Sequence, residues 1–253
     1  MCLVLKLTLA PLLIALASLA GRRWGPRIAG WIVGFPIVAG PTLLFFAVEQ
    51  GTVFTSEAAY KTVVGLFPYC AFALSYAYYA QRYNRWWSLF LAWGMFFISA
   101  LIFYQYFALG LWPTWALATL ALSGTWFLLP KFQKGLEAPV HAPWDLLVRM
   151  LAAGALVYVL TELAHVLGPT WSGLLTPFPV AASVLTTAAH IHHGYQGAMR
   201  ILGGIVVGLL GFALFVALLS CLIVPLGISA AFTLSLAFCA VAQVFILRFW
   251  PKG

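Results

Sequence analysis

The chain has 253 residues, of which 64% are hydrophobic and only 7% are charged, and its mean hydropathy is +1.02. So little polar surface excludes a soluble globular protein and predicts an all-α, polytopic membrane protein. The formal net charge of +8 does not indicate nucleic acid, because no basic run with interleaved aromatic residues lies in a polar segment. The four cysteines lack C-x-x-C spacing and are expected to be small packing residues, so they indicate neither a metal site nor a redox compartment.

Nine helices of about 20 residues, the length that crosses the hydrocarbon core, are expected along the chain. The first covers residues 1–20. We interpret it as a span and not as a cleaved signal peptide, because the chain repeats it as a true span at 144–167. A polar loop is expected at 49–60, and the most linker-like connection lies at 131–143. The other spans are expected at 28–48, 61–80, 86–109, 112–129, 171–190, 200–224 and 228–249.

An internal repeat organises these helices. Residues 25–51, GPRIAGWIVGFPIVAGPTLLFFAVEQG, align without a gap with residues 168–194, GPTWSGLLTPFPVAASVLTTAAHIHHG, at an offset of 143 residues. An ungapped match through two proline-containing motifs is hard to produce by chance in this composition. Each copy has four helices, and one linker helix lies between the copies. Five spans therefore precede the second copy, so the two copies enter the membrane from opposite faces. We therefore expect inverted repeats at 1–110 and 144–253, joined by a linker helix and a cytoplasmic loop at 111–143.

The basic residues predict the orientation. Lysine and arginine accumulate in cytoplasmic loops, and here nearly all of them fall on one predicted side of the membrane. Only Lys6 and Lys61 fall on the other side. The amino terminus is therefore expected outside and the carboxyl terminus inside a bacterial-type cytoplasmic (inner) membrane. The residues on the basic side are Arg22, Arg23, Arg27, Arg82, Arg85, Lys131, Lys134, Arg149, Arg200, Arg248 and Lys252.

Each copy places a Phe-Pro pair inside a predicted helix, at Phe35 and Pro36 and again at Phe178 and Pro179. A proline removes one backbone N–H and displaces the carbonyl one turn back, so neither helix is expected to be regular at that level. Two interpretations follow. The helices are broken and line a transport path, with the phenylalanines as gates, or they are kinked so that neighbouring helices can pack.

Ionisable residues inside the spans are candidates for transport chemistry. Glu162 and His165 lie three residues apart on one helix face, where they could share a proton and couple transport to it. Alternatively, Glu162 reaches the lipid headgroups. Lys6 and Arg149 occupy equivalent first turns of two spans, and they either attract an anionic substrate or anchor the helices at the interface.

Gln105 and Gln243 are matched intramembrane amides, which bridge helices or contact a polar ligand. His190, His192 and His193 form a loop-end group without a second cluster or an H-E-x-x-H motif, so no metal site is expected. The sequence lacks a repeated set of acid, base and nucleophile, so it does not indicate an enzyme.

The motif that runs from Gly173-Leu174 to Phe178-Pro179, with a looser version from Gly30-Trp31 to Phe35-Pro36, resembles uncharacterised bacterial inner-membrane proteins. These include the half-length GlpM-like family of four spans. A four-span unit would cover one repeat, so the resemblance implies a fused duplication of that unit. It implies no catalytic residues.

The expected function is alternating-access transport of a small molecule, with an anionic or lipid-like substrate and proton coupling as further expectations. The alternative is a membrane-embedded scaffold, assembly or lipid-handling protein that does not transport. The expected partners are membrane lipids and a small-molecule substrate, and the sequence also allows a homo-oligomer. Neither an enzymatic activity nor a cofactor is expected.

Overall fold

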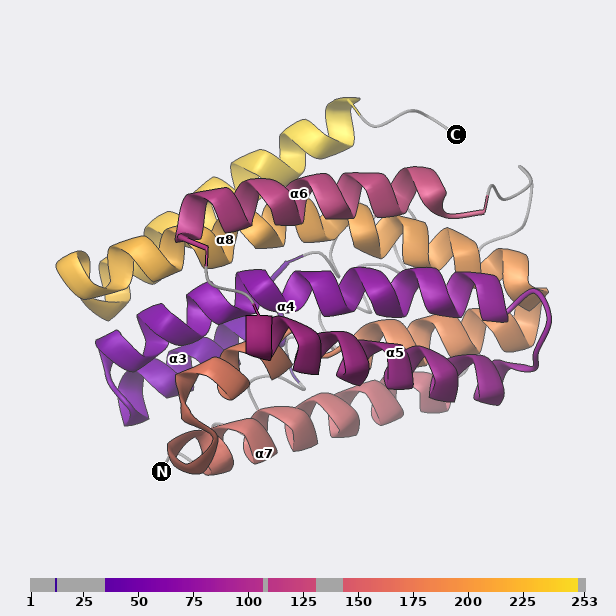
Figure 1. Ribbon diagram of the computed structural model, residues 1–253, viewed down its shortest axis with the longest axis horizontal. Coiled ribbons are helices and arrows are strands. Elements are labelled where there is room, and N and C mark those ends of the chain that lie inside the picture. The colour runs from indigo at the N-terminus through magenta and orange to yellow at the C-terminus, as the bar shows by residue number, and fades with distance from the viewer. Residues whose placement is uncertain (1–11, 13–34, 107–108, 131–142, 250–253) are drawn as a thin grey trace.

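The computed structural model describes residues 12, 35–106, 109–130 and 143–249, and within these ranges the chain forms helices and turns but no strand (Figure 1). This confirms the expected all-α class. Residues 1–20 other than Leu12, and so Lys6, lie outside the described ranges, as does most of the linker at 131–143. The helices are α3 (Ala39–Glu49), α4 (Thr52–Tyr79), α5 (Arg85–Tyr106), α6 (Leu111–Leu128), α7 (Pro143–Leu175) and α8 (Val180–Phe249).

Glycines divide α8 into three segments. Gly194 has φ 63° and Gly227 has φ 75°, values that glycine adopts without the steric cost that other residues meet there. The chain reverses direction at both positions (Figure 1). We call residues 180–193, 195–226 and 228–249 the first, middle and last segments of α8.

Within the described ranges, three stretches are long and apolar enough to cross a membrane: Arg85–Gln105, Leu146–Leu175 and Gly194–Ile246. Ala39–Glu49 and Val180–Ile191 are shorter apolar helices. A straight helix of 53 residues would be about 80 Å long, against a hydrocarbon core of about 30 Å. The reversal at Gly227 resolves this excess, and these helices support the prediction of a membrane protein.

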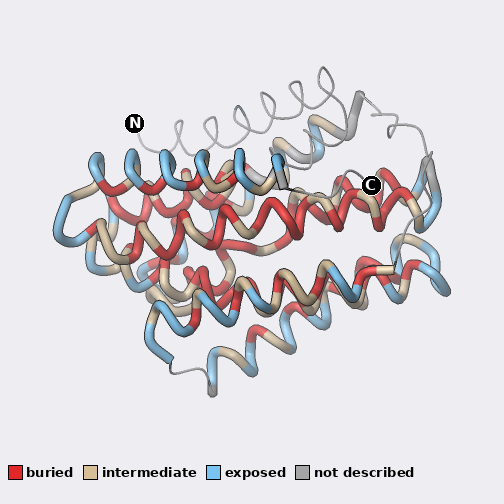
Figure 2. The backbone as a smooth tube through the Cα atoms, turned by 90° about the horizontal axis from the view of Figure 1, so that it is seen from above, coloured by how far each residue is buried: buried red, intermediate tan, exposed pale blue. Residues whose placement is uncertain are grey.

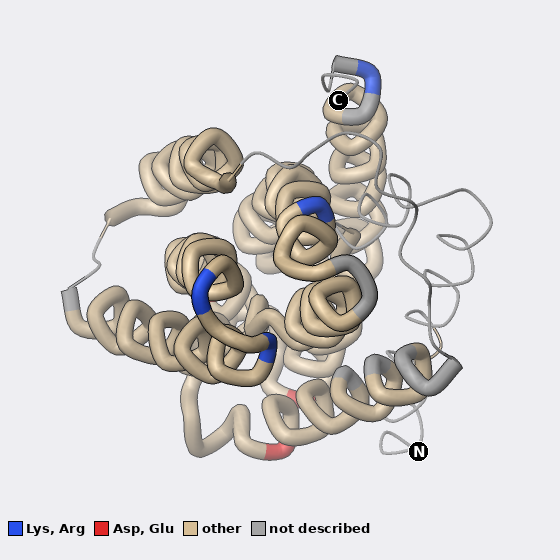
Figure 3. The backbone as a smooth tube through the Cα atoms, turned by 90° about the vertical axis from the view of Figure 1, so that its right-hand side faces the viewer, with Lys and Arg blue, Asp and Glu red and all other residues tan. Residues whose placement is uncertain are grey.

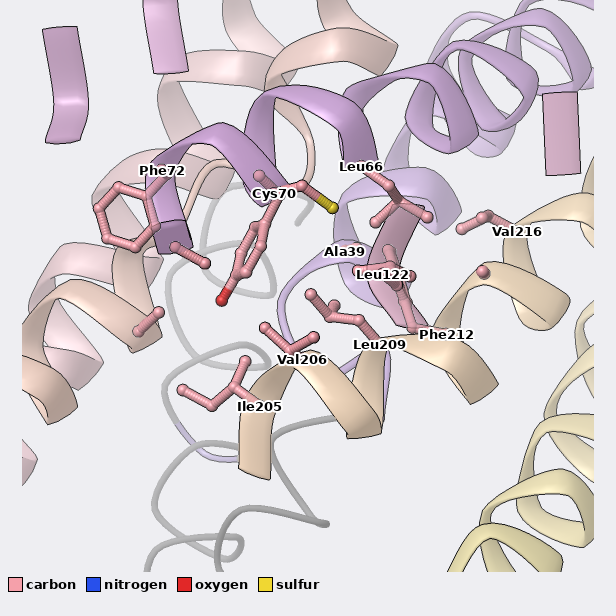
Figure 4. Packing of buried hydrophobic residues seen from close by; sticks show 14 of the residues in the cluster. Ala39, Leu66, Cys70, Phe72, Leu122, Ile205, Val206, Leu209, Phe212 and Val216 are labelled. Atoms are coloured by element: carbon pink, nitrogen blue, oxygen red, sulfur yellow. The ribbon is translucent and has the colours of Figure 1, made fainter. Parts of the chain in front are cut away.

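α4 and the middle segment of α8 form the centre of the bundle and run antiparallel. Ser56 Oγ donates to the Ser220 carbonyl at 2.6 Å, and Ser220 Oγ donates to the Ser56 carbonyl at 2.8 Å. Buried residues concentrate on the inner helices, whereas the outer helices are exposed along their outward sides (Figure 2). Close to the centre, Leu66, Leu122 and Phe212 belong to one apolar cluster shared by α4, α6 and α8 (Figure 4).

Arg82 and Arg85 lie at the opposite end of α4 from Glu57. Arg82 and Arg85 lie in and after the turn that ends α4, at the end that faces the viewer in Figure 3. Glu57 lies in the first turns of α4, at the opposite end, where the Thr170 hydroxyl is 3.4 Å from its carboxylate. Lys61 lies one turn after Glu57 on α4, so it is the arginines, and not all the described cations, that lie away from Glu57.

The prediction of a loop is wrong at two places. The polar loop at 49–60 is helical from Thr52, because Gly51 with φ 91° makes the turn by itself. Thr55 and Glu57 are compatible with the first helical turns, where the Thr55 hydroxyl bonds to the Gly51 carbonyl at 2.9 Å. The connection expected at 191–199 is likewise helical except at Gly194. In both places one glycine replaces the longer loop that the polar residues suggested.

Candidate functional site

The stretch from Gly168 to Gly194 forms a discontinuous helix. Gly168, with φ 68° and ψ 172°, ends the long part of α7, and Pro169 begins a short helix that runs to Leu175. Helical structure then stops over residues 176–179 and resumes at Val180, the first residue of α8. Pro177 and Pro179 have no N–H to donate, so a continuous helical hydrogen-bond ladder cannot pass this level. The interruption falls where the sequence predicted an irregular helix.

The break is packed tightly on α4. A Cβ atom added to Gly65 would lie 2.6 Å from Pro177 Cγ and 2.8 Å from the Leu174 carbonyl oxygen. The Thr62 hydroxyl donates to the Gly173 carbonyl at 3.2 Å, so one backbone group before the break has a partner on α4. Satisfying such groups through neighbouring helices is what allows non-helical backbone within a membrane.

Phe178 lies in an aromatic cluster on α5. Its ring centroid is 5.7 Å from Trp93, 5.2 Å from Phe96 and 5.5 Å from Phe97. Pro179 is buried directly beside it in the sequence. The break therefore has α4 backbone on one side and α5 aromatic rings on the other.

The corresponding part of the first copy shows a similar local pattern. Residues 35–38 are not helical, Pro36 is buried and Phe35 packs against the core. The Gly40 N–H donates to the Pro36 carbonyl at 2.8 Å as α3 begins. Of the predicted pathway residues, Phe35, Pro36, Phe178 and Pro179 thus lie at two helix interruptions.

A polar stripe follows the break along the first segment of α8. We give this name to Ser183, Thr186, Thr187 and His190, whose spacing of i, i+3, i+4 and i+7 places them on one helix face. Trp93 Nε1 on α5 donates to Ser183 Oγ at 2.9 Å. At the other end of the stripe, the Tyr76 hydroxyl of α4 lies 3.2 Å from His190 Nδ1. The stripe is therefore held between α4 and α5.

The two threonines of the stripe are buried; within the described part of the chain the Thr186 hydroxyl has no hydrogen-bond partner, and the Thr187 hydroxyl interacts with that of Tyr76. Other threonines in this protein bond to the carbonyl four residues earlier, as Thr62 does to Ala58 and Thr161 does to Val157, both at 2.8 Å. Ser172, on the short helix before the break, is also buried without a partner in the described ranges. Buried hydroxyls without partners are costly, which marks this region as suited to a polar ligand or to water.

Replacing Thr186 with valine is expected to raise the free energy of unfolding by about 1 kcal/mol, because valine keeps the shape and removes a desolvated hydroxyl. Thr62→Val is the matched control. It removes a buried hydroxyl that is bonded to both Ala58 and Gly173, so it should lower the free energy of unfolding by a similar amount. Denaturation of both variants in detergent measures the difference. Equal destabilisation by the two changes would show that Thr186 has a partner in the native protein.

Other predicted site residues lie apart from this stripe. Gln243 is fully buried in the last segment of α8, and its Nε2 donates to the Gly208 carbonyl at 2.6 Å, so it bridges two segments of α8. Gln105 lies on the exposed side of α5. Glu162 and His165 are exposed on α7. Lys6 is outside the described residues, and only the backbone of Arg149 is described, within α7.

No family model, curated protein or solved structure matches the chain. The resemblance to the GlpM-like unit therefore stays a prediction. Among the described residues, no group of three or more histidine, cysteine, aspartate or glutamate side chains could hold a metal ion.

The sequence interpretation missed the polar stripe, although a signal for it was present. In an otherwise apolar helix, the residues at 183, 186, 187 and 190 are polar at helical spacing. His190 was grouped with His192 and His193 and not with the polar residues one and two turns before it. Tyr76 and Trp93 come from other helices, so only the fold brings them to it.

Proposed function

We propose that this protein is an integral membrane transporter of a small molecule that works by alternating access, without catalysing a reaction. The observation that carries the proposal is the discontinuous helix at 168–194, which joins a buried break to a stripe of polar side chains. Broken helices near the middle of the membrane are a recurring construction of substrate sites in secondary transporters.

The course of the chain supports inverted repeats in this proposal. In each copy a non-helical Phe-Pro segment precedes a helix of at least 11 residues, and the helix ends at a glycine with positive φ, Gly51 or Gly194. The next helices, α4 and the middle segment of α8, correspond in the repeat and run in opposite directions (Figure 1). Opposite directions are what a pseudo-two-fold axis in the membrane plane requires.

The nine-span arrangement is part of the same proposal. α4 has 28 residues and α6 has 18, which give helices of about 42 Å and about 27 Å, close to or above the thickness of the hydrocarbon core. The end that carries Arg82 and Arg85 is proposed to face the cytoplasm of a bacterial-type cell, because positive charge accumulates on that side. The carboxyl terminus is then inside and the amino terminus outside.

One observation favours the alternative, a membrane-embedded scaffold. Pro177 against Gly65 and Phe178 among three aromatic rings form a closely packed break. In a scaffold this packing is permanent. In a transporter it belongs to one of two conformations, and the break becomes accessible to water in the other.

Single cysteines at Ile37 and Val180 separate the two functions, because these residues directly follow Pro36 and Pro179 and are equivalent in the repeat. The background lacks the four native cysteines. A small charged thiol reagent is applied to each face of sealed vesicles. Transport predicts that both sites react and that the reactive face changes with conditions. The control is Leu120→Cys, on an exposed apolar side of α6, which should stay unreactive.

If both break sites stay unreactive from either face while a loop cysteine at Gln81 is labelled, the breaks are permanent packing features. The transporter proposal then fails and the scaffold replaces it.

A further inference from the structure

The stripe ends beside an arginine that the sequence assigned only to topology. Arg85 is the first residue of α5 and follows the turn after α4, whose last turn carries Tyr76. Arg85 Nε is buried and has no hydrogen-bond partner within the described part of the chain. Asn84, and not Arg85, caps the helix: its Oδ1 accepts from the N–H groups of Trp86 and Trp87 at 3.1 Å each. The guanidinium is therefore not needed to begin α5.

The groups gathered here favour a ligand with negative charge. An arginine, two buried threonine hydroxyls and a tyrosine hydroxyl offer hydrogen-bond donors, and arginine keeps its charge in proteins. The acidic residues whose side chains are described, Glu49, Glu57 and Glu162, lie on other helices or at the opposite end of α4. No described carboxylate in this part of the bundle offers a cationic ligand a counter-charge.

We propose that Arg85, Thr187 and Tyr76, between α4, α5 and the first segment of α8, bind a small oxyanion of the phosphate or carboxylate class. The inference rests on the proposed transport function, for which it supplies the substrate class. Arg85 contributes charge-assisted hydrogen bonds to the anion. The Thr187 and Tyr76 hydroxyls, which lie together at this end of the stripe, donate to the anion, and the Tyr76 oxygen accepts from His190 Nδ1 at 3.2 Å.

Two sources share this chemistry, a free anion in the cytoplasm and the phosphate of an anionic lipid headgroup. Arg85 is half-buried and Trp86 and Trp87 beside it are exposed, so both sources reach this end of the bundle. The test therefore includes an arm for each.

The experiment measures equilibrium binding of radiolabelled inorganic phosphate to the full-length protein in phosphatidylcholine nanodiscs, with and without phosphatidylglycerol. Saturable binding is expected. Arg85→Gln should weaken it at least about tenfold, the loss expected for one charge-assisted hydrogen bond. Thr187→Val, which keeps the side-chain shape, should weaken it about threefold or more. Arg82→Gln is the matched control, since Arg82 is exposed three residues earlier, and it should leave binding unchanged.

If the anion is free, phosphatidylglycerol does not change the affinity for phosphate. If the ligand is a headgroup, phosphatidylglycerol weakens phosphate binding and raises the unfolding temperature of the wild type but not of Arg85→Gln. The proposal is overturned if neither phosphate nor phosphatidylglycerol has an effect that depends on Arg85 and Thr187. The cysteines at Ile37 and Val180 report separately on transport. If phosphate binding depends on Arg85 but the reactive face of these cysteines never changes, the anion site stands and transport is rejected. If the reactive face changes but binding does not depend on Arg85, only the anion site is rejected.

Discussion

Gly173→Ala is expected to lower the free energy of unfolding by about 3 kcal/mol, the upper part of the usual range for overpacking a close contact. A Cβ atom at this position would overlap the Ala58 carbonyl oxygen and lie 2.6 Å from Lys61 Cβ. Backbone on α4 cannot move aside as the end of a flexible side chain can. The short helix before the break would have to retreat from α4, and the bond from Thr62 to the Gly173 carbonyl would lengthen or break.

Unfolding of Gly173→Ala by denaturant in detergent, followed by helical content, measures this loss. Gly94→Ala on α5 is the matched control, because nothing lies within 4 Å of an added Cβ atom there. Alanine at position 94 should stabilise the helix by up to about 1 kcal/mol through its higher helix propensity. Similar behaviour of the two variants would show that α4 and the short helix are not in close contact in the membrane.

The all-helical fold and the positions of the breaks could both be predicted from the sequence, for the same reason. In a chain this apolar, backbone groups must find partners within helices, and proline is the residue that prevents it. The Phe-Pro pairs therefore marked the interruptions at residues 35–38 and 176–179. Helix boundaries near Gly51 and Gly194 were harder to predict, because the polar residues around each glycine suggested a long loop. Near Gly51 the Thr55 hydroxyl instead bonds to the Gly51 carbonyl within the helix.

The site could be predicted only in part. The Phe-Pro residues come from local sequence, and their places at the interruptions follow from local chemistry. The pairing of Trp93 with Ser183 and of Tyr76 with His190 joins residues 90 and 114 positions apart, so it depends on how three helices pack. The matched glutamines show the limit of repeat symmetry. Gln243 is buried against another segment of α8, whereas Gln105 is on an exposed side of α5.

The contact between Gln243 and the middle segment of α8 gives the second large expected effect. A Cβ atom at Gly211 would lie 2.7 Å from Gln243 Cδ and Nε2 and 2.8 Å from Cγ, so glycine provides the space in which the amide reaches the Gly208 carbonyl. Gly211→Ala should therefore lower the free energy of unfolding by about 1–2 kcal/mol, because it displaces the Gln243 amide and breaks its buried bond to the Gly208 carbonyl. Gln243→Ala should lower it by about 1–2 kcal/mol, because it removes an interhelical hydrogen bond and buried side-chain atoms.

A double-mutant cycle tests whether these two residues act through one contact. With alanine at 243 the side chain that Gly211→Ala would strike is absent, so the double variant should be more stable than the sum of the two losses predicts, by about 1–2 kcal/mol. Gly124→Ala, where nothing lies within 4 Å of an added Cβ atom, should instead be additive with Gln243→Ala. Unfolding in detergent provides all the values. An additive result for Gly211→Ala would mean that the last segment of α8 does not pack on Gly211. A coupled result would identify the Gln243 amide as a group that holds the last segment of α8 against the middle segment.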